Sequence, residues 1–590
     1  MIRAAIAHGS GRRLLLYEAP CAVEMALRPG EVLPVLARVE AMVEAHGLHA
    51  VGMVSYEAVA AMDPALPWRD PGPWPLVWFA LFAPRFREVP CPKPRALCLP
   101  DWEPEMGPAA YVQAIDRIRH YLAAGETYQV NLTYRLRAPF SADPWELWGH
   151  LFARQPSPHA VYLETDDWAV CSASPELFFR RVGPCLLSRP MKGTAPRGRF
   201  LEEDGLQAAA LRSCAKERAE NVMIVDMVRH DLGRVCRPAS VRVPRLLEVE
   251  RYPTVWQMTS LVCGRTDADL ARIFQALFPA ASITGAPKVR TAHIIQELEP
   301  SVRRVYTGAL GWVRPGQRAH FNVAIRTVLV DNRRAEAEYG VGGGIVWDSV
   351  PEAEWRETQL KARVLGPRPR DFGLVETMRA TPQGVPLWSW HRKRLAESAQ
   401  YFGFRVPWSA LEEECRLHCR GLSHPAVLRL ELWPDGRRHW SIRALPRPVR
   451  PYRLVFAERP VDERDPCVCH KTTLRQHLDA ERARASAMGA HDAILVNRQG
   501  HVTETTIASI VVLFQGQWLT PPRRCGLVPG VLRQRLCARG RVQQAVLTPE
   551  TVRHAQRILL VNAVRGAWPA VMGDERKRGP GEETAWPGVF

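Results

Sequence analysis

The chain has 590 residues, of which 46% are hydrophobic and 24% are charged, and its formal net charge at pH 7 is +18. The length predicts two to four globular domains, and the composition excludes a disordered or fibrous protein. The charge alone is compatible with nucleic-acid binding, but the arginines are scattered, without a basic stripe, zinc-finger spacing or an aromatic RNA-binding motif. We therefore expect anionic small molecules, and no nucleic acid, as ligands.

The cysteines and the N-terminus indicate the compartment. The 14 cysteines lack the paired spacing of secreted disulfide scaffolds. No apolar run reaches the roughly 18 residues of a membrane span, and the N-terminus lacks the features of a signal peptide. We expect a cytoplasmic protein that makes no contact with a membrane.

The first third of the chain has the pattern of a mixed α/β domain. Short apolar runs surround a stretch at 32–46 whose apolar positions recur with the helical period. A second amphipathic stretch, 111–124, is followed by Gly125, a residue typical of helix ends, and then by an apolar strand at 132–136.

Two chemically active side chains come next. Residues 173–179 place Glu176 at the start of an apolar run, and residues 188–198 place Lys192 before a Gly-Thr pair between two prolines. For an arbitrary lysine an exposed turn is the more common setting. Here only eight of the 79 basic residues are lysines, which indicates that lysine is kept where an amine that can lose its proton is needed. We predict Lys192 as a nucleophile and Glu176 as a general acid.

Further elements follow in order along the chain. The helices are expected at 216–228, 270–278 and 288–298, and the strands at 305–313 and 321–330. Gly342, Gly343 and Gly344 form a glycine run that predicts a turn whose backbone donors bind carboxylates.

Three glutamates suggest a cation site. Glu354 and Glu357 lie three residues apart and so share a face of the helix expected after the glycine run. Together with Glu220 they offer the hard oxygen ligands that Mg²⁺ prefers. A solvated acidic face explains the same spacing equally well.

A new pattern begins after the Gly/Pro-rich residues 365–370. A basic helix carries Arg394, and the scarce Lys471 precedes two threonines. Glu504 follows a strand and a turn, and the Gly/Pro-punctuated loop 526–533 opens a helix in a way that suits a phosphate.

On these motifs residues 1–365 resemble aminodeoxychorismate synthase component I, a group of the chorismate-using enzymes that also include anthranilate and isochorismate synthases. The matching motifs lie at 125–131, 173–179, 191–194, 220–234, 283–290, 306–311, 321–327 and 342–357. The resemblance implies a large domain of antiparallel sheets with outer helices, of mixed α+β and α/β character.

The resemblance also implies a reaction and a set of site residues. Lys192 would attack ring C2 of chorismate while Glu176 helps the C4 hydroxyl to leave, and ammonia would then add at C4. At position 192 aminodeoxychorismate synthases have a lysine and anthranilate synthases have an alanine, so Lys192 matches the former. Gln129 stands where the water-adding isochorismate synthases carry a lysine as general base. Mg²⁺ would be held by Glu220, Glu354 and Glu357. The implied substrate-binding residues are Gln129, Gly193, Thr194, Tyr306, Arg326, Gly342, Gly343, Gly344 and Lys361.

Residues 371–571 resemble 4-amino-4-deoxychorismate lyase, of the two-lobed fold-type IV pyridoxal-phosphate family. By that match Lys471 would bond pyridoxal 5′-phosphate and Glu504 would pair with its pyridine nitrogen. Arg394 and the amides of Val531 and Leu532 would hold the phosphate. The implied reaction is elimination of pyruvate to give 4-aminobenzoate, a folate precursor.

The sequence departs from both patterns in a few positions. His230 stands where asparagine is usual, and Trp355-Arg356 replaces a Tyr-Gln pair between the two glutamates. In the second part Ser509 stands where asparagine is expected and Leu478 where an aromatic residue is common. The departures in the second part bear on substrate specificity more than on the cofactor.

The predicted organisation is a synthase domain at 1–365, a lyase-like domain at 366–572 and a tail at 573–590. An anthranilate synthase-like first domain with a D- or branched-chain aminotransferase-like second domain is the alternative, and a degenerate second module is a further one. The chain shows no nucleophile-elbow cysteine with a downstream His-x-Glu, so ammonia would come from solution or from a separate glutamine amidotransferase. A homodimer through the second domain is compatible with the resemblance.

Overall fold

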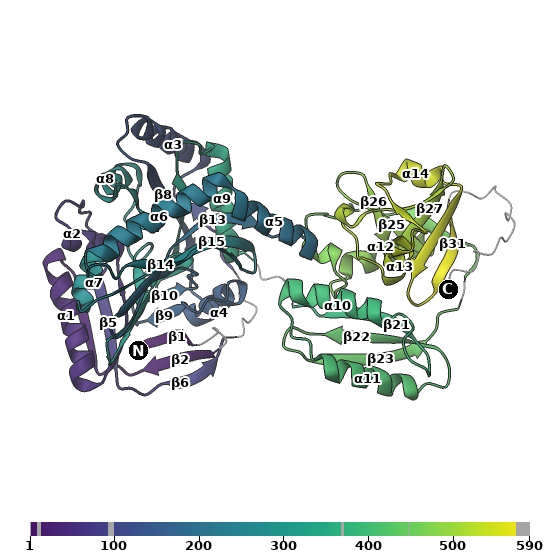
Figure 1. Ribbon diagram of the computed structural model, residues 1–590, viewed down its shortest axis with the longest axis horizontal. Helices are drawn as coiled ribbons and strands as arrows, with labels where there is room; N and C mark the ends of the chain where they lie inside the picture. Colours follow the sequence, from purple (N-terminus) through teal and green to yellow (C-terminus); the bar gives the residue numbers. More distant parts are fainter. Residues whose placement is uncertain (1, 9–12, 93–98, 367–370, 448, 574–590) are drawn as a thin grey trace. The chain divides into compact units, whose positions relative to one another are not determined.

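The computed structural model describes residues 2–8, 13–92, 99–366, 371–447 and 449–573 (Figure 1). The chain divides into two compact units, residues 1–196 with 208–368 and residues 197–207 with 369–590. Residues 367–370 of the predicted boundary at 365–370, and residues 574–590 of the predicted tail at 573–590, lie outside the described residues. Within the described ranges, no helix combines the length and the apolar character needed to span a bilayer.

The first unit is built on two antiparallel sheets, each of ten strands among the described residues. The first sheet has the order β16 (Gly285–Ala286), β8 (Gln129–Pro139), β20 (Glu336–Ile345), β19 (Thr327–Asp331), β10 (Trp168–Ser172), β9 (Val161–Glu164), β1 (Arg3–His8), β2 (Arg13–Glu18) and β6 (Arg87–Pro90), with β7 (Glu103–Pro104) on β8. The second has the order β13 (Met191–Pro196), β15 (Val255–Arg265), β12 (Cys185–Arg189), β11 (Leu177–Val182), β18 (Arg318–Val323), β17 (Ala309–Arg314), β4 (His49–Val54), β5 (Val77–Phe82) and β3 (Ala22–Ala26), with β14 (Arg242–Arg251) on β15.

The two sheets share one apolar core, and each has a second core on its outer face. Strand β5 shows why: Trp78, Ala80 and Phe82 join the core between the sheets, whereas the alternate residues Phe79 and Leu81 face the helices. The helices α1 (Pro29–His46), α2 (Val59–Met62), α6 (Ala215–Gly233) and α7 (Leu270–Leu277) cover the second sheet. The first sheet is covered by α3 (Pro108–Ala123), α4 (Pro144–Arg154), α8 (Lys288–Leu298) and α9 (Pro351–Ala362). The predicted antiparallel sheets with outer helices are confirmed.

Three predicted elements of this unit differ in the structure. The expected strand 321–330 is broken into β18 and β19, which belong to different sheets, because Arg326 adopts a left-handed φ of 52° where the chain crosses between them. The expected strand 305–313 begins only at Ala309. The predicted glycine turn at Gly342–Gly344 lies within β20, where the three residues pair with Thr133, Leu132 and Asn131.

The second unit has two lobes, as predicted. The small lobe, visible in Figure 1, joins β21 (Leu374–Ala380), β22 (Ala426–Leu432) and β23 (Arg438–Ala444) with α10 (Trp388–Phe402) and α11 (Trp408–Arg420) around one core. The large lobe has a mixed sheet in which β24 pairs in parallel with β25 and β31. Its order is β26 (Val502–Thr505), β25 (Asp492–Val496), β24 (Tyr452–Phe456), β31 (Gly566–Met572), β30 (Arg557–Asn562), β27 (Ser509–Phe514), β28 (Gln517–Thr520) and β29 (Gln543–Gln544), with α12 (Gln476–Ala487), α13 (Val531–Ala538) and α14 (Pro549–Arg553).

One segment departs from the predicted division. Residues 197–207, which the sequence analysis assigned to the first domain, group with the second unit. They include the start of helix α5 (Leu201–Ser213). Contacts between residues far apart in the sequence cause this grouping, so no local pattern could indicate it.

Candidate active sites

Lys192 lies in an edge strand of the second sheet of the first unit. The predicted loop around it is strand β13, whose register with β15 shifts between Met191 and Thr194 because Gly193 has a φ of 97°. Asn221 donates a hydrogen bond from Nδ2 to the Lys192 carbonyl oxygen at 3.0 Å. A Cβ atom on Gly344 would lie 2.7 Å from Lys192 Nζ, so a glycine in β20 leaves the space that the amine occupies.

Gln129 lies beside the amine with its polar atoms unpaired. The residue is 1% exposed, and neither its Oε1 nor its Nε2 atom has a hydrogen-bond partner among the described residues. A Cβ atom on Gly344 would clash with the same amide nitrogen. Because buried polar groups are almost always satisfied, an orphaned amide next to a lysine amine indicates a place for a ligand.

Glu176 is a buried carboxyl group whose pKa lies near neutral pH. It is 4% exposed, and Ser282 donates a hydrogen bond from Oγ to its Oε1 atom at 2.7 Å. Burial raises the pKa of Glu176 to about 7, against the opposing effects of Ser282 and Lys192. A carboxyl group with this pKa can donate a proton near neutral pH.

The charge of Lys192 depends on opposed neighbours. Burial lowers the pKa of its amine, and the ammonium of Lys361 lowers it further. The carboxylates of Glu220, Glu176 and Glu357 act in the other direction. The result is an amine with a pKa below the ordinary lysine value, which favours the neutral, nucleophilic form.

The predicted Mg²⁺ ligands do not form a ready-made triad. Lys361 Nζ contacts Glu357 Oε1 at 2.8 Å and lowers the pKa of that carboxyl group, while Ser349 donates to Glu354 Oε1 at 2.7 Å. Burial raises the pKa of Glu220. Over the described ranges, no group of three or more His, Cys, Asp or Glu side chains is placed to hold a metal ion. The Mg²⁺ site at these three glutamates stays a prediction, and Glu354 and Glu357 each already contact another side chain.

Lys361 links several predicted substrate-binding residues. Its Nζ atom donates to the Gly342 carbonyl oxygen at 2.8 Å, and its own carbonyl oxygen accepts a hydrogen bond from Arg326. A Cβ atom on Gly343 would lie 3.8 Å from Lys361 Nζ. Along residues 340–345 strand β20 pairs with β8, while its pairing with β19 ends at Tyr339. The other edge of this glycine-rich stretch therefore offers backbone groups to a ligand.

Two predicted residues lie apart from this group. The Thr194 side chain is exposed and donates to Gln257 Oε1 at 3.1 Å. Tyr306 is 7% exposed, packs against Gly340 and has the Arg135 guanidinium 4.8 Å from its ring centre. The sequence did not single out Glu217, whose carboxylate accepts a hydrogen bond from the Thr194 amide.

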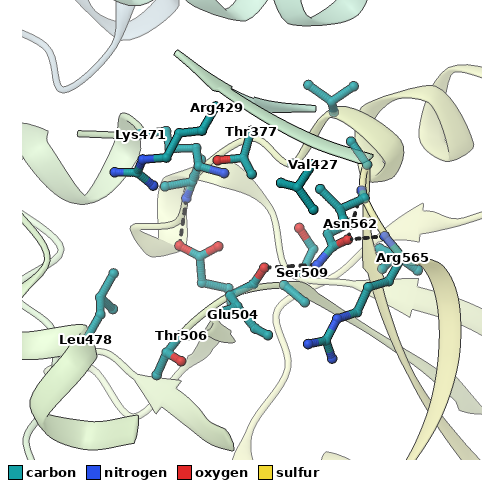
Figure 2. Close-up of a pocket in the computed structure, with 18 of the residues that line it drawn as sticks. Thr377, Val427, Arg429, Lys471, Leu478, Glu504, Thr506, Ser509, Asn562 and Arg565 are labelled. Atoms are coloured by element: carbon teal, nitrogen blue, oxygen red, sulfur yellow. Dashed lines mark hydrogen bonds between the residues drawn. The ribbon is translucent and has the colours of Figure 1, made fainter. Parts of the chain in front are cut away.

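The second unit contains a cavity of about 620 Å³ that brings the predicted cofactor residues together. Lys471, Glu504, Arg394 and Val531 line it, whereas Leu532 is buried behind it. Figure 2 shows Lys471 and Glu504 from this cavity, with Leu478 and Ser509 also on its wall. Both positions that depart from the expected lyase pattern therefore line the cavity.

Lys471 is an amine in strongly cationic surroundings. Burial lowers its pKa to about 7, and Arg394, Arg475 and Arg429 lower it while Glu376 opposes them. Val375 donates a backbone hydrogen bond to the Lys471 carbonyl oxygen at 2.8 Å, which fixes the main chain at the lysine.

Glu504 and Arg394 are each held by a second group. The Val528 amide donates to Glu504 Oε1 at 3.0 Å, and burial raises the pKa of this carboxyl group to about 7. Arg394 donates from Nε and a terminal nitrogen to the two oxygens of Glu376, at 2.9 and 2.6 Å. Burial would raise the pKa of Glu376, but Arg394 and His391 hold it at about 2. An arginine fixed in this way presents its remaining donors in one direction.

The start of α13 has the features of an anion site. Gly530 is its N-cap residue, and the first amides of a helix have no partner within the helix. A Cβ atom on Gly530 would clash with Ser509 Oγ. That hydroxyl is buried and has no hydrogen-bond partner among the described residues. A serine in place of asparagine therefore leaves a polar atom beside the helix start that a phosphate would satisfy.

Of the arginines that line this cavity, only Arg394 was predicted from the sequence. Its only acidic lining residues are Asp479 and Glu504, considering the described residues. The arginines that line it are Arg394, Arg429, Arg443, Arg475, Arg482 and Arg565. They come from different elements of both lobes, so only the fold brings them together, and the scattered arginines of the sequence gave no signal.

Comparison with known proteins matches both units. The model of the family described as chorismate binding enzyme matches residues 17–367, more than half of the chain, and the model described as amino-transferase class IV matches residues 373–571. Anthranilate synthase component I from Streptococcus pneumoniae TIGR4 has a crystal structure that covers 60% of this chain and 92% of that chain, with a TM-score of 0.53 at 25% identity.

Curated relatives match the first unit only in part. Aminodeoxychorismate synthase component 1 of Bacillus subtilis (strain 168) is 42% identical over 254 residues, which is 43% of this chain and 54% of that protein. Anthranilate synthase component 1 of Streptomyces coelicolor is 41% identical over 267 residues, 45% of this chain and 52% of that protein. The chain thus spans about half the length of the curated relatives it matches. By its family match, the chain belongs to the chorismate binding enzymes.

Proposed function

We propose that this protein makes 4-aminobenzoate from chorismate in two steps, amination at C4 with ammonia and then elimination of pyruvate. The observation that carries the proposal is that one chain holds two lysines of lowered pKa, each near a carboxyl group whose pKa is raised to about 7, namely Glu176 and Glu504. The first lies in the chorismate-binding unit and the second in the class IV aminotransferase unit.

In the first step Lys192 acts as the nucleophile. Its Nζ atom forms a bond to ring C2, the ring double bond shifts, and the C4–O bond breaks as Glu176 gives its proton to the leaving hydroxyl, which departs as water. Ammonia then forms a bond to C4, the double bond shifts back and the C2–N bond to Lys192 breaks. The new C4 ammonium returns a proton to Glu176. The net change consumes ammonia and releases water, and Lys192 is regenerated.

Two residues favour amination at C4 over the anthranilate alternative. An alanine in place of Lys192 would leave no nucleophile for a covalent route, and the unpaired amide of Gln129 lies beside that amine. An amide neither removes nor supplies a proton, which suits ammonia, a nucleophile that attacks without prior deprotonation. Gln129 therefore supports an entry site for ammonia.

We propose that Mg²⁺ joins this site together with the substrate carboxylate. Glu220 of α6 and Glu357 of α9 provide hard oxygen donors, and the charge of Glu357 contributes to the raised pKa of both Glu220 and Glu354. Mg²⁺ usually binds through one or two protein carboxylates plus anionic groups of the substrate, so a complete protein cage is unnecessary. Arg326, Lys361 and the free edge of β20 would hold the remaining substrate oxygens.

The second cavity fits pyridoxal 5′-phosphate. The Glu504 carboxyl group on the cavity wall, an arginine held by Glu376, a helix start and the unpaired Ser509 hydroxyl match the pyridine nitrogen and the phosphate. When bound, the cofactor supplies an electron sink for the charge left on the substrate carbon. Lys471 removes the proton from C4 of the substrate, and pyruvate leaves as the ring becomes aromatic.

The arginines on the wall support a dianionic substrate for the second step. Aminodeoxychorismate carries two carboxylates, and Arg429 and Arg565 reach the cavity from different lobes (Figure 2). A branched aliphatic side chain would gain nothing from such a wall, since burying unpaired charge is costly. The wall therefore favours a lyase over the aminotransferase alternative.

The source of ammonia lies outside this chain in our proposal. Two of the curated relatives are described as component 1 of a synthase. We propose that a separate glutamine amidotransferase subunit supplies ammonia, and that free ammonium replaces it in the test tube.

The test is to incubate the full-length protein with chorismate, Mg²⁺ and ammonium, with and without pyridoxal phosphate, and to separate the products by chromatography. We expect 4-aminobenzoate and pyruvate with the cofactor, and aminodeoxychorismate alone without it. Anthranilate as the product would contradict the first assignment. Aminodeoxychorismate that persists in the presence of cofactor would contradict the second.

A further inference from the structure

A segment encoded within the chorismate-binding match contributes to the second unit. Residues 197–207 follow β13, the strand of Lys192, and lie inside the matched range 17–367. Their contacts nevertheless group them with residues 369–590. We call residues 197–204 the arm.

The arm is a closed, rigid structure. The Arg197 guanidinium donates from Nε and a terminal nitrogen to the two oxygens of Asp204, each at 2.7 Å, and the Gly198 amide donates to the same carboxylate at 3.0 Å. Asp204 is 2% exposed, so this ion pair is shielded from water. A Cβ atom on Gly198 would clash with the main chain at Asp204, which leaves glycine as the residue that fits the turn.

The arm docks on the second unit through apolar and main-chain contacts. Phe200 is 5% exposed and has the Arg523 guanidinium 4.3 Å from its ring centre. Tyr401 donates from its hydroxyl to the Gly198 carbonyl oxygen at 2.7 Å. Arg199 donates to the carbonyl oxygens of Glu463 and Arg524, at 2.9 and 2.8 Å. These contacts hold the arm at a defined place on this unit.

The arm contacts His470, the residue that precedes Lys471, through the Arg199 carbonyl oxygen. His470 is 2% exposed, and its Nε2 and Nδ1 atoms lie 3.1 Å from the Arg199 carbonyl oxygen and 2.8 Å from Ser398 Oγ. Burial lowers the pKa of His470 to about 3, so the ring is neutral. Because a carbonyl oxygen only accepts, Nε2 carries the proton and Nδ1 accepts from Ser398. The ring also stacks on Tyr401 at 4.8 Å between centres.

We infer that the arm positions Lys471. The main chain at this lysine is held on one side by Val375 of β21 and on the other by the arm through His470. The side chain of a residue follows its main chain, so the arm sets the direction in which the amine enters the cavity. This inference rests on the proposed role of Lys471 in binding the cofactor. It predicts that the lyase-like residues 366–572 depend on the arm, which lies outside them in the sequence, to position Lys471.

The test uses the full-length protein and four variants. Phe200→Ala loosens the arm, His470→Leu removes the bond to the arm, and His470→Gln restores a donor to Arg199. Leu206→Ala is the matched control, because Leu206 follows the arm but is 66% exposed. We would measure the affinity for pyridoxal phosphate, the pH at which the visible absorbance of the bound cofactor changes, and the amination of chorismate as a measure of intact folding.

We expect Phe200→Ala and His470→Leu to weaken cofactor binding by about tenfold, as expected for a lost buried hydrogen bond. Both should also shift the pH midpoint of the absorbance, while amination stays at the wild-type rate. His470→Gln and Leu206→Ala should behave like wild type. Wild-type affinity and midpoint in both disruptive variants would overturn the inference. If Phe200→Ala does not fold, the contrast between His470→Leu and His470→Gln decides.

A separate measurement keeps the proposed function distinguishable from the inference. Borohydride reduction of the wild-type protein with pyridoxal phosphate, followed by peptide mapping, should place the label on Lys471. A label elsewhere would remove the proposed role of this lysine. A label on Lys471 together with unaffected disruptive variants would remove the role of the arm alone.

Discussion

Lys192 and Lys471 are both desolvated, but opposite charges surround them. Carboxylates of Glu220, Glu176 and Glu357 face Lys192 and offset the effect of burial on its pKa. Arginines surround Lys471 and add to the effect of burial, which brings its pKa to about 7. The same side chain thus has a different charge balance in the two units.

The difference follows from what each site must do before its substrate arrives. In the proposed synthase site the glutamates offset the effect of burial on the Lys192 amine until Mg²⁺ and the dianionic substrate bind and Mg²⁺ coordinates those carboxylates. In the proposed lyase site the amine must be neutral to bond the cofactor, and the arginines that keep it neutral can also bind the phosphate and the substrate carboxylates. In the second unit, but not in the first, the same arginines both keep the lysine neutral and bind the anionic groups of cofactor and substrate.

The largest expected effects separate the two lysines. We expect Lys192→Ala to abolish amination and Lys471→Ala to abolish pyruvate release, each by roughly 10⁴-fold or more, because each removes the group that bonds substrate or cofactor. Lys471→Ala should accumulate aminodeoxychorismate, measured by chromatography. Lys393→Ala, at an exposed lysine on α10, is the control and should leave both activities unchanged. With aminodeoxychorismate supplied directly for the second step, loss of both activities in either variant would show that the sites do not work independently.

Glu176→Gln should cost about 10²- to 10⁴-fold in amination, because the amide fills the same space but cannot donate a proton. The carboxyl group must be protonated to act as an acid, and its pKa is about 7, so wild-type amination should fall as the pH rises above that value. The variant should lack this decline. A pH profile of the rate checks both points, and an unchanged decline in the variant would assign it to another group.

The sequence predicted the main helices of the first unit and singled out its chemically distinctive side chains. Lysine scarcity pointed to Lys192 and Lys471, and periodicity predicted the helices that became α1, α3 and α6. The break at Arg326 was not predictable, because the apolar pattern continues through a residue at which the chain changes sheets. The paired state of the predicted metal ligands also depended on contacts across the fold.

The second site was predicted less completely for a physical reason. Its cofactor residues sit in local motifs, whereas its arginine wall is assembled from residues between 394 and 565. The arm is the extreme case, since Arg199 meets His470 across 271 positions of the chain. Features built from such distant contacts leave no periodicity, spacing or composition signal.

The arginine wall should matter for the substrate more than for the cofactor. We expect Arg565→Gln to raise the KM for aminodeoxychorismate by about ten- to a hundredfold, since it removes a charged hydrogen bond to a carboxylate. Cofactor affinity should stay at the wild-type value if Arg565, which lies on the wall beside Asn562 (Figure 2), contacts the substrate alone. Steady-state kinetics and cofactor titration check this pair of results. A lower affinity for the cofactor with an unchanged KM would show that Arg565 contacts the cofactor and not the substrate.

The smallest effect concerns the charge of Lys471 itself. A neutral amine bonds the cofactor, so the rate of cofactor capture should rise about tenfold between pH 6 and 8 and level off above a midpoint near 7, whereas an ordinary lysine would show no plateau in this range. Arg475 lowers the pKa of Lys471, so Arg475→Gln should move the midpoint to higher pH. Stopped-flow absorbance of the protein mixed with pyridoxal phosphate measures the midpoint. An unmoved midpoint would mean that burial alone, without the arginines, keeps this amine neutral, and the contrast with Lys192 would then reduce to the carboxylates of the first site.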